Sequence, residues 1–170
     1  MMDNVPLQCV FIEEGMLIGL GESLGERART IVGMRNLAAD QVRVMSLVAH
    51  PDTPMAEMEP IAEIEELKTI AVMRLAMPDR LIPASLDVGG LAGLQKRLEA
   101  GANVVTSLIV PGMGLSGVAN QELDIEDARR TPQAIAPVLE QCGLAPASVA
   151  EFRAWLVERE QQETEVRVFA

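Results

Sequence analysis

The chain has 170 residues, 49% of them hydrophobic, which is enough to bury one sizeable core, so we expect a single domain over residues 1–170. Its 25 acidic and 14 basic residues give a net charge of −11, which repels nucleic-acid phosphates and anionic lipids. The expected partner is therefore a small molecule or another protein, not nucleic acid or a membrane.

Targeting and metal signals are weak. No apolar run reaches the ~18 residues of a membrane span. The start MMDNVPLQ lacks the basic and apolar regions of a signal peptide, so we expect a cytoplasmic protein. Cys9 and Cys142 belong to no CxxC or Cys/His cluster. They predict buried free thiols, and no metal site is expected from this chain alone.

Short apolar runs alternate with helical patterns along the first two thirds of the chain. Residues 15–21 predict a strand, and the spacing of Ser23 and Glu26 is that of a capping box that opens a helix. The expected apolar stripe of this helix is Leu24, Ala28, Ile31 and Met34. Further strands are expected at 41–48, 80–88 and 103–110, with a helix over 90–101. Between the second and third strands, a helix with Ile61, Ile64, Leu67 and Ile70 on one face is expected to end at Pro78.

The last third is expected to hold two helices. Thr131 followed by Pro132 predicts a helix start, and Gly143 its end. Ser148 and Glu151 form a second capping box, which opens the last helix. The tail TEVRVFA, residues 164–170, alternates in polarity, which suits an edge strand or a loose terminus.

This order gives four βα units plus a C-terminal helix. The strands are so continuously apolar that we expect a parallel sheet covered on both faces. A doubly wound open sheet and half of an eight-stranded TIM-type barrel, whose full size is typically ~250 residues, are both compatible with the order. Both architectures bind ligands at the carboxyl ends of the strands, where Glu22, Ser85 and Asp87 fall.

The third strand carries a polar pair. Alternation places Ser85 and Asp87 on one face of it and the apolar residues on the other. A carboxylate there needs a cation, and Arg43, inside the second strand, needs an anion. Either Arg43 and Asp87 form a buried pair, or they face a cavity and bind a zwitterion. In the second case Arg43 would hold a carboxylate, and Asp87 with Ser85 would accept from an ammonium group.

Three other side chains near strand ends are weaker candidates. His50, the only histidine, follows the second strand and predicts either a general base or, more simply, a solvated loop residue. Thr106 and Ser107, in the fourth strand, could reach the same cavity or bond to the backbone.

Several segments resemble radical S-adenosylmethionine enzymes of the biotin synthase-like group. GMLIGLGE, residues 15–22, is similar to the motif GxIxGxxE, with Leu17 in the isoleucine place. DTPM, residues 52–55, stands where these enzymes often have GTPL or GTPM. The long segment from PDRLIPASLDV to NVVTS, residues 78–107, and the later GLSGVAN resemble the methylornithine synthase branch most closely.

The resemblance implies a C-terminal half-barrel with particular roles. It implies that Gly19 and Gly21 let the backbone approach S-adenosylmethionine and that Glu22 holds a donor, although Glu22 could simply suit the start of the following helix. It implies that Arg43, Ser85 and Asp87 hold an α-amino acid. The implied reaction is a radical rearrangement of lysine to 3-methylornithine, started by a 5′-deoxyadenosyl radical.

The sequence departs from this family in one respect. The family binds a [4Fe–4S] cluster through CxxxCxxC in its first βα loop, and the 170 residues contain no such motif. We therefore expect a substrate- and cofactor-binding half without catalytic residues of its own, inactive alone and completed by an N-terminal half-barrel chain, or a homodimer. The alternatives are a non-catalytic module that binds an amino acid or nucleoside and a self-associating half-barrel remnant.

Overall fold

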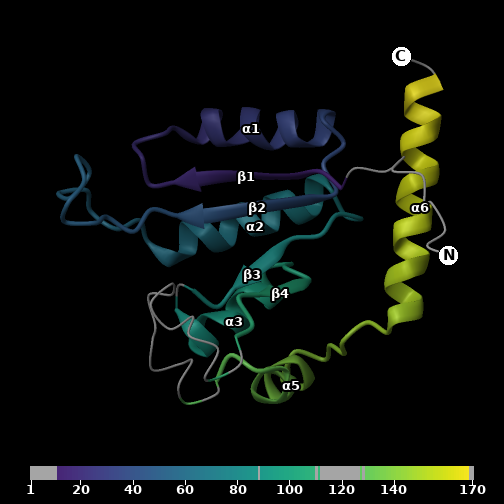
Figure 1. The fold of residues 1–170 in the computed structure, drawn as a ribbon. Helices are drawn as coiled ribbons and strands as arrows, with labels where there is room; N and C mark the ends of the chain where they lie inside the picture. Colours follow the sequence, from purple (N-terminus) through teal and green to yellow (C-terminus); the bar gives the residue numbers. More distant parts are fainter. Residues whose placement is uncertain (1–10, 88, 110, 112–126, 128, 169–170) are drawn as a thin grey trace, which may run out of the picture.

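The structure, a computed structural model, describes residues 11–87, 89–109, 111, 127 and 129–168 (Figure 1). Cys9 and the GLSGVAN segment lie outside the described residues. The strands are β1 (Glu13–Ile18), β2 (Gln41–Ser46), β3 (Pro83–Ser85) and β4 (Val104–Thr106). The helices are α1 (Leu24–Asn36), α2 (Glu63–Ala76), α3 (Gly90–Glu99), α5 (Pro132–Gln141) and α6 (Val149–Val168). The expected α/β alternation is confirmed.

The strands are parallel, as the sequence predicts. β1 pairs with β2 and β3 pairs with β4, with Gly15 opposite Arg43 and Ser85 opposite Thr106. A single parallel bridge between Gln41 and Leu81 joins the two ladders. The described sheet is thus two short pairs in chain order and not one continuous ladder.

Each strand is shorter than predicted, and backbone geometry explains two of the ends. The strand expected over 15–21 stops at Ile18 because Gly19 and Gly21 have φ of 93° and 95°, outside the extended region. The strand expected over 103–110 stops at Thr106, since Ser107 has a φ of 63°. The strands occur in the predicted order along the chain. Their predicted lengths were too long because apolar residues continue beyond the last residues that pair with the neighbouring strand.

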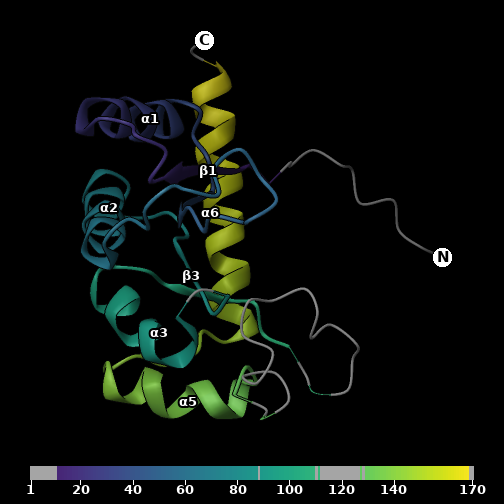
Figure 2. The same ribbon diagram turned by 90° about the vertical axis from the view of Figure 1, so that its left-hand side faces the viewer.

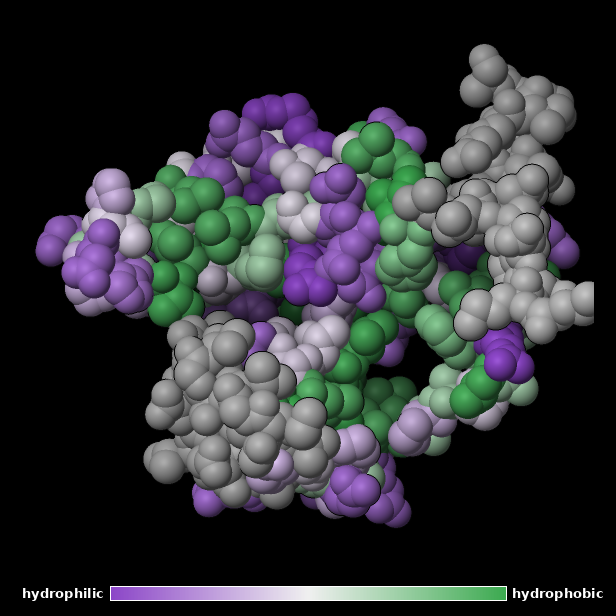
Figure 3. All heavy atoms as spheres, in the orientation of Figure 1, coloured by the Kyte–Doolittle hydropathy of each residue, from purple (hydrophilic) through white to green (hydrophobic). Residues whose placement is uncertain are grey.

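Helices cover one face of the strands. In Figure 2, α1, α2, α3 and α5 follow one another along one side. The strand residues that point toward them are buried: Met16, Ile18, Val42, Val44 and Ala84. On the other face Leu17 and Met45 are 39% and 44% exposed, so the prediction that both faces are covered is wrong for the described residues. Figure 3 shows hydrophobic side chains on this surface of β1 and β2.

The predicted buried faces of helices α1 and α2 are only partly confirmed. In α1, Ile31 and Met34 are buried, but Leu24 is 74% exposed and Ala28 is exposed. In α2 the buried face is Glu66, Thr69, Ile70 and Met73. Of the four isoleucines and leucines expected on that face, only Ile70 is buried, because Ile61 precedes the helix and Ile64 points outward, 53% exposed.

The predicted helix starts are confirmed. Ser23 and Glu26 make both bonds of a capping box, and Thr131 accepts from the backbone N–H of Ala134. At α6 the Ser148 and Glu151 side chains exchange the same pair of bonds. Capping residues predict helix starts correctly here because a cap depends only on the geometry of a few neighbouring residues.

The tail prediction is wrong, since α6 runs to Val168 and takes in residues 164–168. The helix stands across the amino ends of the strands (Figure 1). Arg159 Nε donates to Asp40 Oδ1 at 2.8 Å, and Trp155 Nε1 donates to the Asp79 carbonyl at 3.1 Å. These contacts tie α6 to loops at the amino ends. No helix in the described part of the chain is long and apolar enough to cross a membrane.

Candidate functional site

A cavity of about 240 Å³ is lined by residues of β2 and β3 and by two buried side chains from α2 and α3. Arg43, Ser85 and Asp87, the three residues that the sequence singled out together, all line it. Leu17 and Met45 give it an apolar wall, and Ser46, Glu66 and Arg97 also line it. Because side chains alternate along parallel strands, Arg43 and Asp87 share the face that the helices do not cover.

Asp87 is held by three donors. Arg130 Nη1 lies 2.7 Å from Oδ1, while the hydroxyls of Ser107 and Ser85 lie 2.5 Å and 3.1 Å from Oδ2. Burial alone would raise the pKa of Asp87, but the hydrogen bonds from Ser107, Arg130 and Ser85 outweigh it, so the pKa lies below its ordinary value. The Asp87 side chain remains 45% exposed, whereas that of Arg130 is 1% exposed.

Ser107 reaches Asp87 from a left-handed backbone conformation, with φ of 63°. Non-glycine residues seldom adopt this region, and such positions cluster at functional sites. Its hydroxyl lies 3.2 Å from that of Ser85 and shares Asp87 Oδ2 with it. Thr106, the other hydroxyl of interest, buries an Oγ1 that has no hydrogen-bond partner in the described structure. Of the two, Ser107 is the one that contacts the site.

Arg43 has a partner of its own. Its Nη2 pairs with Glu13 Oε1 on the neighbouring strand, and its Nε is buried without a hydrogen-bond partner among the described residues. Asp87 pairs with Arg130 instead. The alternative in which Arg43 and Asp87 satisfy each other directly is therefore wrong.

A third ion pair lines the cavity. Arg97 Nε donates to Glu66 Oε1 at 2.6 Å, and both side chains are over nine-tenths buried. Ser46 donates to the other Glu66 oxygen at 2.7 Å. Since α2 and α3 supply the two charges, this pair joins both helices behind the cavity.

The charge pattern suits a zwitterion. Arg43 and Asp87 present opposite charges to one cavity while each keeps a separate counter-ion. A guanidinium binds a carboxylate through directed hydrogen bonds, and a carboxylate accepts from an ammonium group. The arrangement can therefore orient a small amino acid between the two groups.

Sequence reasoning missed the partners of these charges. Arg130 follows Arg129 in the sequence, yet Arg130 is buried and Arg129 is exposed. Glu66 lies in an acidic stretch that reads as a solvated helix face. The sequence signal for Arg130 was Asp87 itself, because a carboxylate at that place requires a cation. It does not indicate where in the chain that cation lies.

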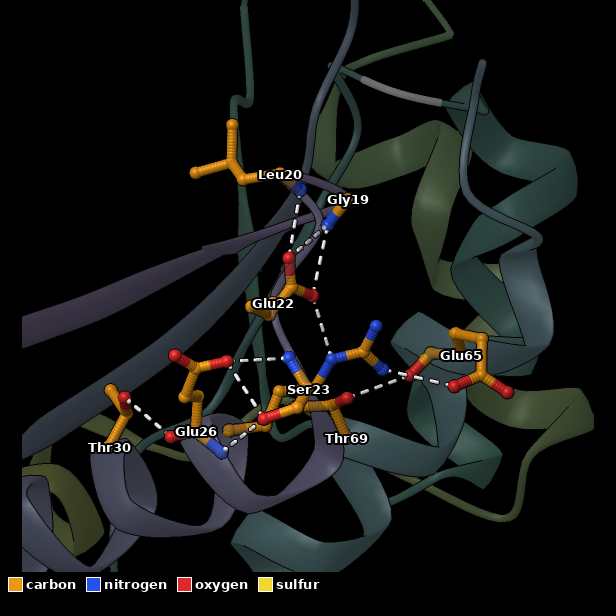
Figure 4. Close-up of polar contacts among 9 residues, drawn as sticks. Gly19, Leu20, Glu22, Ser23, Glu26, Thr30, Glu65 and Thr69 are labelled. Carbon is orange, nitrogen blue, oxygen red and sulfur yellow. Dashed lines mark hydrogen bonds and ion pairs between the residues drawn. The ribbon is translucent and has the colours of Figure 1, made fainter. Parts of the chain in front are cut away.

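The loop after β1 is organised by Glu22 (Figure 4). Its carboxylate accepts from the backbone N–H groups of Gly19 and Leu20, at 3.1 Å and 2.8 Å, and from Arg27 Nε at 2.8 Å. Burial raises the pKa of Glu22, but the bonds from Gly19, Leu20 and Arg27 outweigh it and lower the pKa to about 2. The donors that Glu22 holds in this structure thus belong to its own chain.

The two glycines of this loop differ. A Cβ at Gly19 would lie 3.3 Å from Ile61 Cβ, so Gly19 is required by packing as well as by its φ. A Cβ at Gly21 would meet no atom within 4 Å. Only Gly21 therefore offers open space for a molecule to approach the backbone.

Two further candidates lie apart from these groups. His50 is in a loop with its side chain 67% exposed, and its Nδ1 accepts from the Asp52 backbone at 3.2 Å. Cys142 is free and partly buried against the core. Over the described ranges, no group of three His, Cys, Asp or Glu residues could hold a metal ion.

Residues 43–145 match the model of the Biotin and Thiamin Synthesis associated domain, and this segment includes the three cavity residues. The chain belongs to this family. It is 41% identical over 145 residues to the 3-methylornithine synthase of Methanosarcina barkeri and 40% identical over 141 residues to that of Methanosarcina acetivorans. The resemblance to methylornithine synthase is confirmed.

A crystal structure of methylornithine synthase (PylB) matches with a TM-score of 0.75 and 40% identity, over 84% of this chain and 42% of that chain. The two Methanosarcina matches cover 85% and 83% of this chain, but 41% and 40% of the relatives. The chain thus spans about two fifths of the curated relatives it matches.

Proposed function

We propose that this chain forms the substrate-binding half of a radical S-adenosylmethionine mutase of the methylornithine synthase type, which converts lysine to 3-methylornithine. The observation that carries the proposal is the shared cavity of Arg43, Ser85 and Asp87, in which opposite charges have separate counter-ions. Arg43 would bind the carboxylate of the amino acid. Asp87, oriented by Ser85, would accept from its α-ammonium group.

The half-barrel architecture belongs to this proposal. Four parallel strands in chain order, with helices along one side, are the arrangement expected of four βα units of a TIM-type barrel. Leu17, Met45 and Val48 are exposed on or beside the uncovered strand face. A complementary half-barrel would cover them and would close the cavity around the ligand.

The residues present fit S-adenosylmethionine at one point of the loop. Gly21 leaves its backbone approachable, whereas the Gly19 position is packed against Ile61 and the Glu22 carboxylate is occupied by its own chain. We assign Gly21 to backbone contact with the cofactor, and Gly19 and Glu22 to shaping the loop. A [4Fe–4S] cluster would be held by the CxxxCxxC half and, when bound, supplies the electron that cleaves the cofactor.

Reconstitution tests the function. The 170-residue chain is mixed anaerobically with a cluster-loaded CxxxCxxC half, S-adenosylmethionine and a reductant, and lysine turnover is followed by mass spectrometry. We expect 3-methylornithine from the pair and none from either half alone. Arg43→Gln should abolish turnover, and Lys68→Gln, on the solvated side of α2, should not.

Formation of 5′-deoxyadenosine in the same mixture shows that the cluster half is competent. If it forms and lysine is still not rearranged, the proposed function is wrong. Calorimetry of the chain with lysine, ornithine and S-adenosylmethionine then tests the alternative, a non-catalytic binding module.

The proposed partner is a complementary N-terminal half-barrel or a second copy of this chain. The exposed hydrophobic residues on β1 and β2 favour association over a free monomer. Analytical ultracentrifugation with and without the complementary half distinguishes these states. A monomer under all conditions would contradict both forms of the proposal.

A further inference from the structure

The carboxylate of Asp87 has limited capacity left for a ligand. An ionised carboxylate offers about four lone-pair positions. Ser107 and Ser85 occupy two on Oδ2, and Arg130 occupies one on Oδ1. One position on Oδ1 remains, on a side chain that is 45% exposed and lines the cavity. Asp87 can thus accept one further hydrogen bond in a fixed direction.

The buried guanidinium group of Arg130 makes few hydrogen bonds. Its side chain is 1% exposed, yet only Nη1 has a partner, and Nε and Nη2 are buried with none among the described residues. Burying a guanidinium costs free energy that a single ion pair rarely recovers. The one hydrogen bond that its side chain makes among the described residues is the bond to Asp87.

We propose that Arg130 and Ser107 are positioning residues that keep Asp87 ionised and in one orientation, so that its remaining lone pair receives the ammonium group of a small amino acid. This inference rests on the proposed function for the identity of the ligand. It adds two residues that lie outside the cavity lining and act through Asp87. The left-handed backbone at Ser107 is explained by the same role, because it delivers the hydroxyl to Oδ2 at 2.5 Å.

The surroundings support this role for Asp87. Ser85 comes from β3, Ser107 follows β4 and Arg130 precedes α5, so three separate segments meet at one carboxylate. The other charged residues that line the cavity are Arg43, Glu66 and Arg97. Glu66, the other acid in the cavity lining, is paired with Arg97, so its charge is already compensated.

The first test measures the Asp87 carboxyl directly, by carbon-13 NMR titration of the full chain and its variants. In the parent chain the pKa should lie below the ordinary aspartate value. Arg130→Met should raise it, Arg130→Lys should restore most of the lowering because the charge returns, and Ser107→Ala should raise it in part. If Arg130→Met and Ser107→Ala fold and leave the pKa unchanged, the proposal is wrong.

A matched control uses the aspartate–arginine pair Asp40–Arg159, in which both side chains are buried. Arg159→Lys changes the partner of Asp40 at the opposite end of the strands and should leave the Asp87 titration unchanged. Circular dichroism confirms folding of each variant. Should Arg130→Met not fold, Arg130→Lys and Ser107→Ala still decide the question.

The second test measures the consequence for the ligand in the reconstituted pair. The KM for lysine should rise about tenfold or more in Arg130→Met, the scale of one lost charge-assisted hydrogen bond. The rise should grow as the pH falls toward the raised pKa of Asp87, which a merely structural defect would not produce. Failure of the pair to rearrange lysine, with the Asp87 titration behaving as expected, would refute the proposed function alone.

Discussion

The two ends of the strands carry the same kind of ion pair in different surroundings. At the amino end, Asp40 and Arg159 pair at 2.8 Å with both side chains over nine-tenths buried. At the cavity, Asp87 and Arg130 pair at 2.7 Å, but the aspartate is 45% exposed. A closed pair can only hold elements together, whereas an open carboxylate with a buried cation behind it can also receive a ligand. Exposure of the acid, not the length of the ion pair, distinguishes the cavity end from the amino end.

The cavities at the two ends of the strands also differ in the side chains that line them. The amino end has the larger one, about 860 Å³, lined by residues that include Phe11, Phe152 and Trp155. The aromatic rings pack on one another, with centroids 5.7 and 6.2 Å apart. The cavity at β2 and β3 is smaller, yet charged groups converge on it. In βα architectures the carboxyl ends carry function and the amino ends carry stability.

The largest effect should come from breaking the closed pair. Asp40→Ala leaves Arg159 buried without its main counter-ion and also removes the acceptor for the Ile12 backbone N–H. We expect a loss of about 3–5 kcal/mol in the free energy of unfolding. Urea denaturation followed by circular dichroism measures it. A loss below about 1 kcal/mol would show that α6 is not held by this pair.

Asp87→Ala should reduce the free energy of unfolding less than Asp40→Ala does, but should have the larger effect on lysine turnover. Water in the cavity can solvate the side of Arg130 that Asp87 leaves, so we expect a loss of about 1–3 kcal/mol. Lysine turnover in the reconstituted pair should disappear. If Asp87→Ala were as destabilising as Asp40→Ala, the distinction between the open and the closed pair would fail.

Glu22 provides a pH-dependent prediction at the β1–α1 loop. Its pKa of about 2 lies below the ordinary glutamate value of 4.5, so the stabilisation from its ionised form is fully present above pH 4.5 and is lost as the pH falls toward 2. We expect Glu22→Gln to cost about 1–2 kcal/mol at pH 7. The difference from the parent chain should shrink between pH 4.5 and 3 in urea titrations. A constant difference would mean that the charge is irrelevant.

The smallest predicted stability losses are those of alanine substitutions at the two loop glycines, Gly19 and Gly21. Gly19→Ala combines a positive φ with a 3.3 Å contact to Ile61, and we expect a loss of about 2 kcal/mol. Gly21→Ala has the positive φ alone and should cost about 1 kcal/mol. If Gly21 contacts the cofactor, its alanine variant should also weaken S-adenosylmethionine binding in the reconstituted pair. Equal stability losses would contradict the packing role of Gly19.

Much of the fold was determined by the sequence alone. The capping residues Ser23, Thr131 and Ser148 located three helix starts, because a cap needs only a few neighbouring residues. Alternation along the third strand placed Ser85 and Asp87 on one face, because side chains in a strand point to opposite sides in turn. The parallel order of the strands followed from the βα pattern.

Tertiary structure alone decided which charges meet. Asp87 and Arg130 are 43 residues apart, and Asp40 and Arg159 are 119 apart. No local periodicity links such positions, since packing of whole elements brings them together. The same limit explains the shortened strands, the buried face of α2 and the helical tail. Local pattern identifies which charged residues need a partner, and the packing of distant elements decides which partner each one has.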